Sequence, residues 1–379
     1  MTAILAAALF CAALTLTNLA SVIIAFFRAR PPEASVRAPA PAPGVSIVRP
    51  LCGLETFSQE TLASTFALDY PDYEVILCVA RANDPVAPLA RELIAENPQI
   101  PARLIVGDEK VSANPKLNNC VRGWDAARHG FVALADSNVL MPKDYIQRML
   151  AAFRPNTGLV CSMPIGSKPQ NFWAELECAF LNTYEARWQY AAAAVFGGFA
   201  QGKNMMWRKA VLEAGGGVRA LGGEIAEDAA STKLVNAQGL RVDLVEGPFE
   251  QPLGRRSLRE VWIRQVRWAR MRRKTFPLFF APEIFSGAAP AVLAGAYGAH
   301  LADLGPAGVL AAALAIAACW HLPELALARA LGWPLSWRTP VLLMLRDLTL
   351  PAMYLDAWFV DEFTWRGNAM SVREEPRAS

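Results

Sequence analysis

The sequence predicts an α/β fold with a mostly parallel sheet, together with transmembrane helices at both ends of the chain. Between residues 45 and 275, short apolar runs alternate with helix-length amphipathic stretches, a pattern typical of a parallel sheet with helices on both faces. Long uncharged apolar stretches precede and follow that region. The mean hydropathy of +0.22 is therefore the average of a soluble domain and membrane segments.

The N-terminal segment, residues 1–27, contains no charged side chain. A helix needs about 20 apolar residues to cross the hydrocarbon core of a bilayer, so we expect a transmembrane helix over residues 1–28. A cleavable signal peptide would have a basic start and a shorter apolar core, whereas Arg28, Arg30 and Arg37 follow the apolar run. Because basic residues favour the cytoplasmic side, the N-terminus is expected outside and the next domain in the cytoplasm.

The soluble domain is expected over residues 45–253, after a Pro/Ala linker at residues 29–44 that has no evident means of packing. Its first strand is expected in VSIVRP and its first helix in SQETLASTFAL. The next strands are expected in YEVILCVA, ARLIVGD, FVALAD and TGLVCSM, and the helices between them in DPVAPLARELIAEN, PKLNNCVRGWDAARH and KDYIQRMLAAF. This βα alternation is the basis for the parallel sheet.

A basic amphipathic helix at the membrane surface is expected over residues 254–280, because REVWIRQVRWARMRRKTFP mixes many arginines with apolar residues. Arg264, Arg267 and Trp268 are spaced to share one face of this helix. No nucleic-acid-binding motif accompanies the arginines, so nucleic acid is not an expected partner.

The C-terminal region, residues 281–361, is expected to hold two or three transmembrane helices, broken by Pro and Gly, with a cytoplasmic tail at residues 362–379. The last apolar stretch carries Arg346, Asp347 and Asp356. Charges at membrane depth are costly and normally face protein or a partner charge. We expect Arg346 and Asp347 to pair with each other or to lie at the membrane interface, rather than to act in chemistry.

Charge and cysteine content exclude some classes of protein. The formal net charge is only +3, so the placement of charges is more informative than their sum. The seven cysteines are scattered, with no CxxC pair and no Cys/His spacing typical of zinc sites. Reduced thiols in a protein that faces the cytosol are the expected state.

Polar residues that follow the predicted strands are the first candidates for a site, because open parallel sheets bind ligands at the carboxyl ends of their strands. These residues are Asp84, Asn114, Lys116 and Asp136, and the amide of Asn138 follows two residues after Asp136. No GxGxxG and no GxxxxGK[ST] motif lies near the strand ends, which disfavours a dinucleotide site and a P-loop. A strand-end carboxylate without a glycine-rich cradle favours metal-assisted handling of a diphosphate. A simple turn or helix cap is the alternative for Asp136.

Two later stretches add to this set. The segment GGEIAEDAASTKLV places Glu227 and Asp228 at the start of a helix, where the helix dipole favours carboxylates. The arginines of RQVRW can grip a departing diphosphate with bidentate hydrogen bonds.

Five motifs in this order resemble the ceramide glucosyltransferases, family 21 of the glycosyltransferases. They are ANDP with Asp84, ANPKLNN, ADSN with Asp136, AEDAA with Asp228, and RQVRW. The resemblance spans roughly residues 45–275 and includes the terminal membrane spans. It implies a GT-A fold, a UDP-sugar donor and a membrane lipid acceptor.

The resemblance also implies roles for the residues that match its motifs. Asp84 would contact the uracil end of the donor, with Lys116 and Asn138 on the nucleotide-sugar side. Asp136 would lie near the diphosphate and a divalent cation, Mg²⁺ or Mn²⁺. Asp228 would be the general base. The catalytic set is completed by groups that hold the departing UDP and frame the acceptor, namely Arg264, Arg267 and Trp268.

The metal motif departs from the DxD of many GT-A enzymes, since it reads Asp136-Ser137-Asn138. Ceramide glucosyltransferases also lack the second aspartate. One carboxylate suffices for a cation that keeps several waters and binds phosphate oxygens.

The segment FGGFAQGKNMMWRK is expected by the same resemblance to line the acceptor side, through Gln201, Lys203 and Asn204. The alternative is an ordinary turn followed by a helix that starts at Trp207. NPKLNN likewise has two interpretations, a nucleotide contact through Lys116 or a helix start that leaves Lys116 exposed.

The expected activity is the inverting transfer of a hexose from a UDP-sugar to the primary hydroxyl of ceramide, which gives a β-glycosyl lipid. Glucose is the expected hexose. Diacylglycerol and a hopanoid polyol stay open as acceptors, because the Ala-rich composition is typical of a high-GC bacterium, whose inner membrane is the expected location. A processive polysaccharide synthase normally has more spans. A membrane protein that only binds a nucleotide-sugar or lipid is the alternative from a different class.

Overall fold

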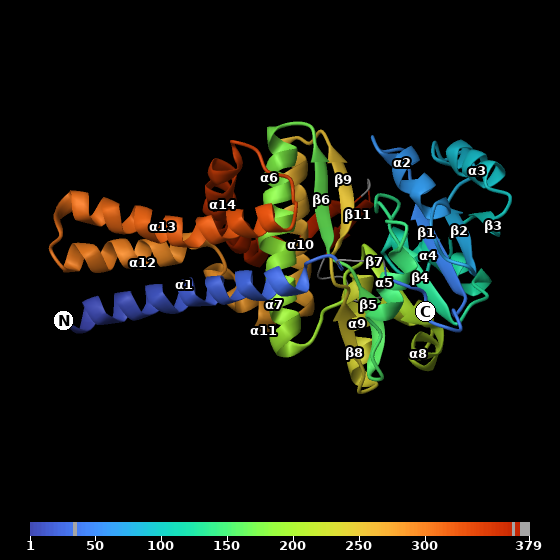
Figure 1. The fold of residues 1–379 in the computed structure, drawn as a ribbon, viewed down its shortest axis with the longest axis horizontal. Coiled ribbons are helices and arrows are strands. Elements are labelled where there is room, and N and C mark those ends of the chain that lie inside the picture. Colours follow the sequence, from blue (N-terminus) through green and yellow to red (C-terminus); the bar gives the residue numbers. More distant parts are fainter. Residues whose placement is uncertain (33–35, 366–367, 372–379) are drawn as a thin grey trace. The chain divides into compact units, whose positions relative to one another are not determined.

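The structure is a computed structural model that describes residues 1–32, 36–365 and 368–371, and these residues form two compact units. The sheet unit contains residues 29–168 and 192–254. The helical unit contains residues 1–28, 169–191 and the described residues between 255 and 371. Figure 1 labels the elements of both units.

The main sheet has, within the described residues, seven strands in the order β3-β2-β1-β4-β7-β5-β8. Neighbouring strands run parallel except at β7, which is antiparallel to both β4 and β5. The predicted mostly parallel sheet is thus confirmed. The strand bounds are β1 (Val45–Leu51), β2 (Tyr73–Val79), β3 (Ala102–Val106), β4 (Phe131–Ala135), β5 (Thr157–Cys161), β7 (Asn204–Arg208) and β8 (Arg241–Leu244).

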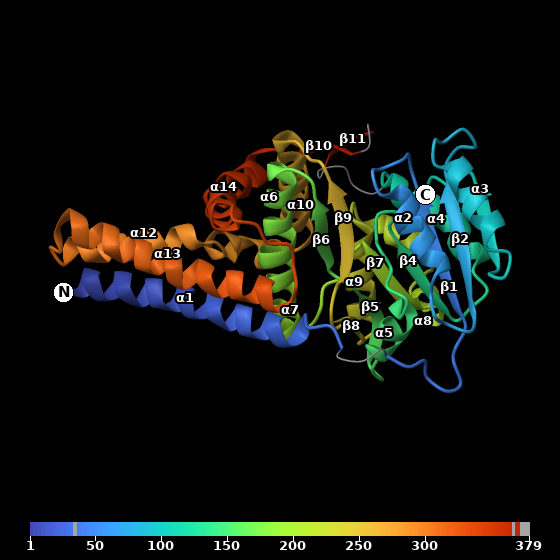
Figure 2. The ribbon, with the colours of Figure 1, turned by 45° about the horizontal axis from the view of Figure 1, so that its top comes forward.

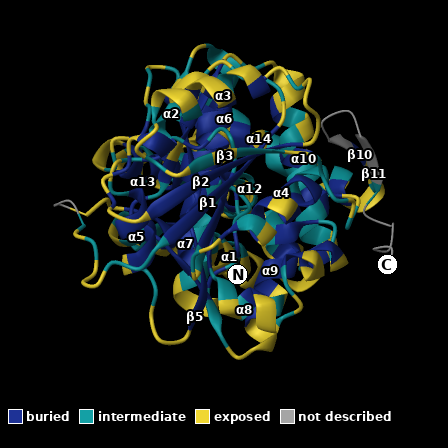
Figure 3. Cartoon of the chain, turned by 90° about the vertical axis from the view of Figure 1, so that its right-hand side faces the viewer, coloured by how far each residue is buried: buried dark blue, intermediate teal, exposed yellow. Residues whose placement is uncertain are grey.

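The register of the central strands brings their carboxyl ends to one edge. Val45 of β1 pairs with Tyr73 of β2 and with Phe131 of β4, so the three strands advance together. β1 and β2 are buried on both faces, and Figure 3 shows them in dark blue. Their continuous apolar runs are what a covered parallel strand requires.

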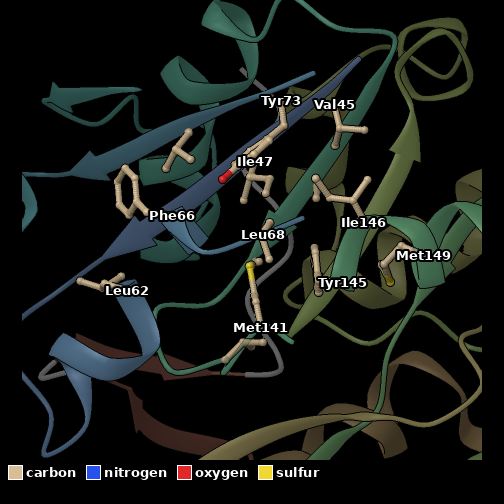
Figure 4. Close-up of a cluster of buried hydrophobic side chains, with 14 of the residues drawn as sticks. Val45, Ile47, Leu62, Phe66, Leu68, Tyr73, Met141, Tyr145, Ile146 and Met149 are labelled. Atoms are coloured by element: carbon tan, nitrogen blue, oxygen red, sulfur yellow. The ribbon is translucent and has the colours of Figure 1, made fainter. Parts of the chain in front are cut away.

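The core on one face of the sheet is drawn in Figure 4. Side chains of β1 and β2, such as Ile47 and Tyr73, pack against Phe66, which follows α2 (Ser58–Ala63). Tyr145 and Met149 of α5 (Tyr145–Ala151) belong to the same cluster. The linker contributes as well, because Ala38 and Ala42 pack against this cluster. A segment expected to have no means of packing is therefore partly docked on the sheet unit.

The predicted helices of the sheet unit are all present. They are α2 (Ser58–Ala63), extended by a 3₁₀ turn at Ser64–Phe66, α3 (Ala87–Glu96), α4 (Pro115–Ala126) and α5 (Tyr145–Ala151). Later elements are α8 (Lys209–Ala214), a 3₁₀ turn at Val218–Gly223, α9 (Glu227–Ala237), and a two-stranded sheet of β6 (Pro164–Pro169) and β9 (Phe249–Gly254).

The helical unit contains a group of long apolar helices that lie side by side (Figures 1 and 2). They are α1 (Thr2–Arg28), α12 (Ala288–Leu301) and α13 (Gly305–Ala330). Ala288, Ala291 and Trp320 are buried at their contact, with Cys11 and Leu14 of α1 packed against them.

The other helices of this unit include one that is continuous through a π-helical turn. This helix comprises α6 (Phe172–Phe180), the π turn at Leu181–Ala186 and α7 (Arg187–Phe196), whose last residues belong to the sheet unit. The remaining elements are α10 (Leu258–Thr275), α11 (Pro277–Phe280), a 3₁₀ turn at Ala281–Phe285, α14 (Thr339–Phe359), and a hairpin of β10 (Glu362–Trp365) and β11 (Asn368–Ser371). The end of the predicted tail, residues 372–379, lies outside the described residues.

Two helices of the described chain, α1 and α13, are long and apolar enough to cross a membrane. A third span is added if the pair Pro277–Phe285 and Ala288–Leu301, which is bent by 46°, counts as one. Helices able to span a membrane thus occur at the N-terminus and near the C-terminus, as predicted. The last stretch predicted to span, which forms α14, is not among the described helices that are long and apolar enough.

The charges of the last helix are satisfied inside the helical unit. Arg346 Nε donates to Asp347 Oδ1 at 2.7 Å, and Arg346 Nη2 donates to Glu324 Oε2 at 2.8 Å. The other oxygen of Glu324 lies 3.0 Å from Arg187 Nη2. All four side chains are buried, and they compensate one another inside the unit, as buried charges require.

Candidate functional site

The candidate site begins at the carboxyl end of β4. Asp136 follows the last residue of that strand, and its backbone N–H donates to the carbonyl of Lys203 at 3.0 Å. Arg49, fully buried on β1, donates from Nη2 to the carbonyl of Asp136 at 2.7 Å and to that of Val139 at 2.9 Å. Strands on both sides therefore fix the position of Asp136.

The carboxylate of Asp136 is paired with two lysines. Lys116 Nζ lies 2.7 Å from Oδ1, and Lys203 Nζ lies 2.9 Å from Oδ2. Burial alone would raise the pKa of Asp136, but the two ammonium groups hold that pKa well below its usual range. Asp136 is therefore an anion at any physiological pH.

Lys116 reaches the site from the first turn of α4. Asn114 caps this helix, since its Oδ1 accepts hydrogen bonds from the backbone N–H groups of Lys116 and Leu117 at 3.0 and 3.2 Å, and Pro115 occupies the first helical position. NPKLNN is thus a helix start. The Lys116 side chain is only 12% exposed, however, so the alternative with an exposed lysine does not hold.

Glu227 is a member of the site that sequence reasoning did not predict as one. Lys116 Nζ lies 2.7 Å from its Oε1, and Asn114 Nδ2 donates to its Oε2 at 2.5 Å. The side chain is buried, as expected for a carboxylate with two firm partners. Its position beside Asp228 in AEDAA is the signal that the sequence offers, but the helix dipole by itself accounts for an acidic residue in the first turn of a helix.

Asp228 lies in the first turn of α9. Its Oδ1 accepts from the backbone N–H of Ala229 at 2.8 Å and its Oδ2 accepts from that of Gly202 at 3.3 Å. Burial and the neighbouring carboxylate of Glu227 raise its pKa from 3.8 to about 6, against the lowering effect of Lys116. The group is therefore a fixed carboxylate that is ionised at neutral pH and more basic than an ordinary aspartate.

Gly202 allows these side chains to converge. A Cβ atom at this position would lie 2.9 Å from Glu227 Oε1 and 3.3 Å from both Asp228 Oδ2 and Lys116 Nζ. Its carbonyl also accepts a hydrogen bond from Lys116. The absence of a side chain is what permits this close approach.

We name Asp136, Glu227, Asp228, Lys116 and Lys203 the carboxylate–lysine cluster. Asn138 adjoins it, because its Oδ1 accepts from Lys203 Nζ at 3.1 Å. Asp84 lies on the loop after β2, where its Oδ1 accepts from the backbone N–H groups of Gly53 and Val86 at 2.9 and 3.0 Å. Through these two hydrogen bonds, the Asp84 carboxylate connects the loop after β1 with the loop after β2.

The three residues predicted on the acceptor side differ in burial and in hydrogen-bond partners. Lys203 belongs to the cluster, and Gln201 is half-buried in the loop before β7. Asn204 is fully buried as the first residue of β7, and its Oδ1 accepts from the hydroxyl of Tyr145 at 3.1 Å. The helix that was the alternative explanation starts at Lys209, and a strand precedes it.

The motif residues Arg264, Arg267 and Trp268 lie on α10 of the helical unit. Arg264 is ion-paired through Nη1 with Glu177 of α6, and Arg256 Nε lies 3.1 Å from the other oxygen of the same carboxylate. Glu177 is fully buried and was not predicted. Other arginines of α10 are also paired, among them Arg272 with Glu283 at 2.8 Å, so much of the helix's positive charge is compensated within its own unit.

The cluster's charge and donor set fit a divalent cation. With every member ionised, the cluster carries three carboxylates and two ammonium groups, a net charge of −1 before any anionic ligand binds. The described residues contain no group of three His, Cys, Asp or Glu side chains that could hold a metal by themselves. Asp136 and the amide oxygen of Asn138 are hard oxygen donors, so a cation here would take its other ligands from a diphosphate and water.

Comparison with known proteins gives a consistent result. Residues 2–378 match the family described as Glycosyl transferase family 21. The sequence is 27% identical over 237 residues to ceramide glucosyltransferase 1 of Caenorhabditis elegans, which is 62% of this chain and 51% of that protein. It is 24% identical over 337 residues to ceramide glucosyltransferase 3 of the same organism, 87% of this chain and 73% of that protein. The chain thus spans about half the length of the first of these relatives.

Among solved structures, the fold resembles the mannosyltransferase PcManGT of Pyrobaculum calidifontis, determined in complex with GDP-Man and Mn²⁺. The TM-score is 0.51 at 19% sequence identity, and the match covers 92% of this chain and 96% of that one. At this identity the likeness establishes the fold.

Proposed function

This chain belongs to glycosyl transferase family 21, and we propose that it transfers a hexose from a UDP-sugar to the primary hydroxyl of ceramide. Glucose is the hexose that we propose. The family and the GT-A fold predicted from the five motifs are both confirmed. The donor sugar and the acceptor belong to the proposal, which the names of the relatives support.

The observation that carries the proposal is the setting of Asp228. Its oxygens are fixed by backbone hydrogen bonds of 2.8 and 3.3 Å, and its pKa of about 6 leaves it ionised at neutral pH but more basic than usual. A lipid alcohol is a poor nucleophile, so its attack benefits from a base that takes the proton. A positioned carboxylate contributes about 10²–10⁴ in rate to such a step.

The stereochemistry follows from a single displacement. As the acceptor oxygen bonds to the anomeric carbon, its proton goes to Asp228 and the bond to the diphosphate breaks on the opposite face. The anomeric centre therefore inverts, and an α-linked UDP-hexose gives a β-glycosyl lipid. No sugar becomes attached to the chain at any stage.

On the donor side, we assign Asp136, Lys116, Lys203 and Asn138 to the diphosphate and Asp84 to the uracil end. Lys116 and Lys203 both pair with Asp136, and in this assignment their ammonium groups would meet the negative charge that grows on the leaving group and lower the barrier electrostatically. A Mg²⁺ or Mn²⁺ ion bound through Asp136 would supply further neutralisation of that charge. Arg264, Arg267 and Trp268 are assigned to the departing UDP and the acceptor end, and Gln201 and Asn204 to the acceptor side.

The membrane helices support a lipid acceptor, since α1 and α13 would anchor the enzyme where that acceptor lies. The arginines after α1 favour a cytoplasmic location for the sheet unit, as does a donor made in the cytosol. We propose a bacterial inner membrane as the location.

The test is an assay on membranes that contain the protein, in which labelled UDP-glucose and UDP-galactose are paired with ceramide, diacylglycerol and a hopanoid polyol. Asp228→Asn is the control variant. The proposal predicts one glycolipid, formed from UDP-glucose and ceramide, that disappears in the control. A product only with another pair would reassign donor or acceptor. UDP-sugar binding without turnover of any pair would instead support a binding protein.

A further inference from the structure

A second group of polar side chains lies within the helical unit, on the α6–α7 helix and on α10. The two helices are joined by the ion pair of Glu177 with Arg264. Eight residues after Glu177, the π-helical turn at Leu181–Ala186 carries Glu185. Such turns widen a helix locally and occur frequently at functional sites.

Three buried polar atoms in this region have no hydrogen-bond partner in the described part of the chain. They are Oε1 of Glu185, Oε1 of Gln189 and Nε2 of Gln265. The Gln265 side chain adjoins Glu185 and lowers the pKa of its carboxyl. Gln265 is only 4% exposed and is the second residue of the RQVRW motif. Glu185 and Gln189 are four residues apart on one helix and so share a face.

Several neighbouring polar groups are paired within the unit. The hydroxyl groups of Tyr184 and Ser286 lie 2.6 Å apart, and Trp188 Nε1 donates to the carbonyl of Ser286 at 3.1 Å. Arg272 makes two hydrogen bonds of 2.8 Å to Glu283. Because a buried polar atom without a partner is costly, a place with three of them points to a ligand that supplies the partners.

The chemistry of the group favours an uncharged ligand. Burial raises the pKa of Glu185 to about 8, although Arg272 and Gln265 lower it and Glu177 and Glu283 raise it further. At neutral pH the carboxyl is therefore mostly protonated and both donates and accepts hydrogen bonds. The two glutamines offer amide donors and acceptors, and Arg264 and Arg272 are already occupied by carboxylates.

We propose that Glu185, Gln189 and Gln265 bind the polar head of the lipid acceptor, and that this head is uncharged and carries amide and hydroxyl groups. An amide presents one donor and one acceptor, which match a glutamine side chain. A phosphate-bearing lipid head would find no unoccupied cation among these residues. The inference rests on the proposed function, because it names the acceptor class of the same reaction.

The experiment measures binding separately from turnover, with purified full-length protein in detergent. The probe is ceramide with an NBD-labelled hexanoyl chain, followed by fluorescence anisotropy, and the KM for UDP-glucose is measured in parallel. Gln265→Leu and Glu185→Leu are each expected to weaken probe binding about tenfold, the effect of one lost hydrogen bond, with the KM for UDP-glucose unchanged. Gln99→Leu, at an exposed amide of the sheet unit, is the matched control and should bind as the wild type.

Glu185→Gln keeps the shape and a neutral amide, so it should bind the probe at pH 7 nearly as well as the wild type. Wild-type binding should weaken above about pH 8 as Glu185 ionises, and this weakening should be absent from Glu185→Gln. That rescue separates a binding role from general damage to the fold.

The outcomes of this experiment distinguish the inference from the proposed function. Unchanged probe binding in both leucine variants would overturn the inference, even if glycolipid synthesis is intact. Equal binding of an NBD-labelled diacylglycerol would overturn its amide component. A third outcome is that the wild type binds the ceramide probe but transfers no sugar to ceramide, while the leucine variants lose probe binding. That outcome would support the binding site and reject the proposed function.

Discussion

The ammonium of Lys116 lies 2.7 Å from a carboxylate oxygen of Asp136 and also 2.7 Å from one of Glu227. One cation thus connects the end of β4, assigned to the diphosphate, with the start of α9, which carries the assigned base Asp228. In the proposed mechanism, this lysine would hold the group at the departing UDP in fixed relation to the base that takes the acceptor proton. Its position is set in turn by the Asn114 cap of α4.

Replacement of this lysine tests that connection. Lys116→Met should lower kcat/KM for the UDP-sugar by about 100-fold or more, the effect of removing one preorganised donor from a developing charge. Lys233→Met, which removes an exposed lysine paired with Glu224, is the control and should leave kcat/KM within about twofold. A wild-type kcat/KM in Lys116→Met would show that the lysine is only structural.

The pH dependence of the reaction should report the Glu227–Asp228 pair. Burial and Glu227 raise the pKa of Asp228 to about 6, and the base must be deprotonated to act. kcat/KM should therefore rise with pH up to about 6 and then level off. In Glu227→Gln the like charge is absent, so the acidic limb should move to lower pH. An unmoved limb would mean that another group controls it.

Removal of divalent cations should abolish activity, because the cluster's net charge of −1 repels a diphosphate unless a cation compensates it. Addition of Mn²⁺ or Mg²⁺ after EDTA treatment should restore turnover. In Asp136→Asn the cation concentration for half-maximal activity should rise about tenfold or more. Full activity in EDTA would indicate that the lysines alone neutralise the leaving group.

Glu177 should matter for the stability of the helical unit, since it is buried between Arg264 and Arg256. Removing one partner of a buried ion pair costs about 3–5 kcal/mol, and the partial exposure of the two arginines places Glu177→Ala near the lower value. The midpoint of thermal unfolding should fall accordingly. Glu60→Ala, which breaks the exposed pair with Lys168, should cost less than about 1 kcal/mol, and equal effects would contradict the assignment.

Much of the fold could be predicted from the sequence because its signals are local. Each parallel strand is a continuous apolar run, and each helix between them has a periodic apolar face. β7 was missed, since NMMWR lacks a strand-like alternation and its pairing depends on β4 and β5, which are distant in sequence. The segment at residues 169–191, placed within the catalytic domain by the predicted boundaries, packs in the helical unit.

In the candidate site, too, the residues with a local sequence signal were predicted and those that depend on distant contacts were not. Asp136, Lys116 and Asp228 were predicted because each follows a strand or starts a helix at the edge where ligands bind. Glu227 was not predicted as a site residue, because the helix dipole alone accounts for an acidic residue in the first turn of a helix. Glu177 and Glu185 belong to a helix about 80 residues before α10, and only the packing of those helices gives their carboxylates a partner or a role.

The central claim is direct displacement with Asp228 as the base, and the anomeric configuration of the product tests it most directly. Proton NMR of the purified glycolipid should show the large H1–H2 coupling of a β-glucoside, and mass spectrometry of the protein after turnover should show unmodified Asp228. An α-linked product, or a sugar attached to Asp228, would contradict the mechanism.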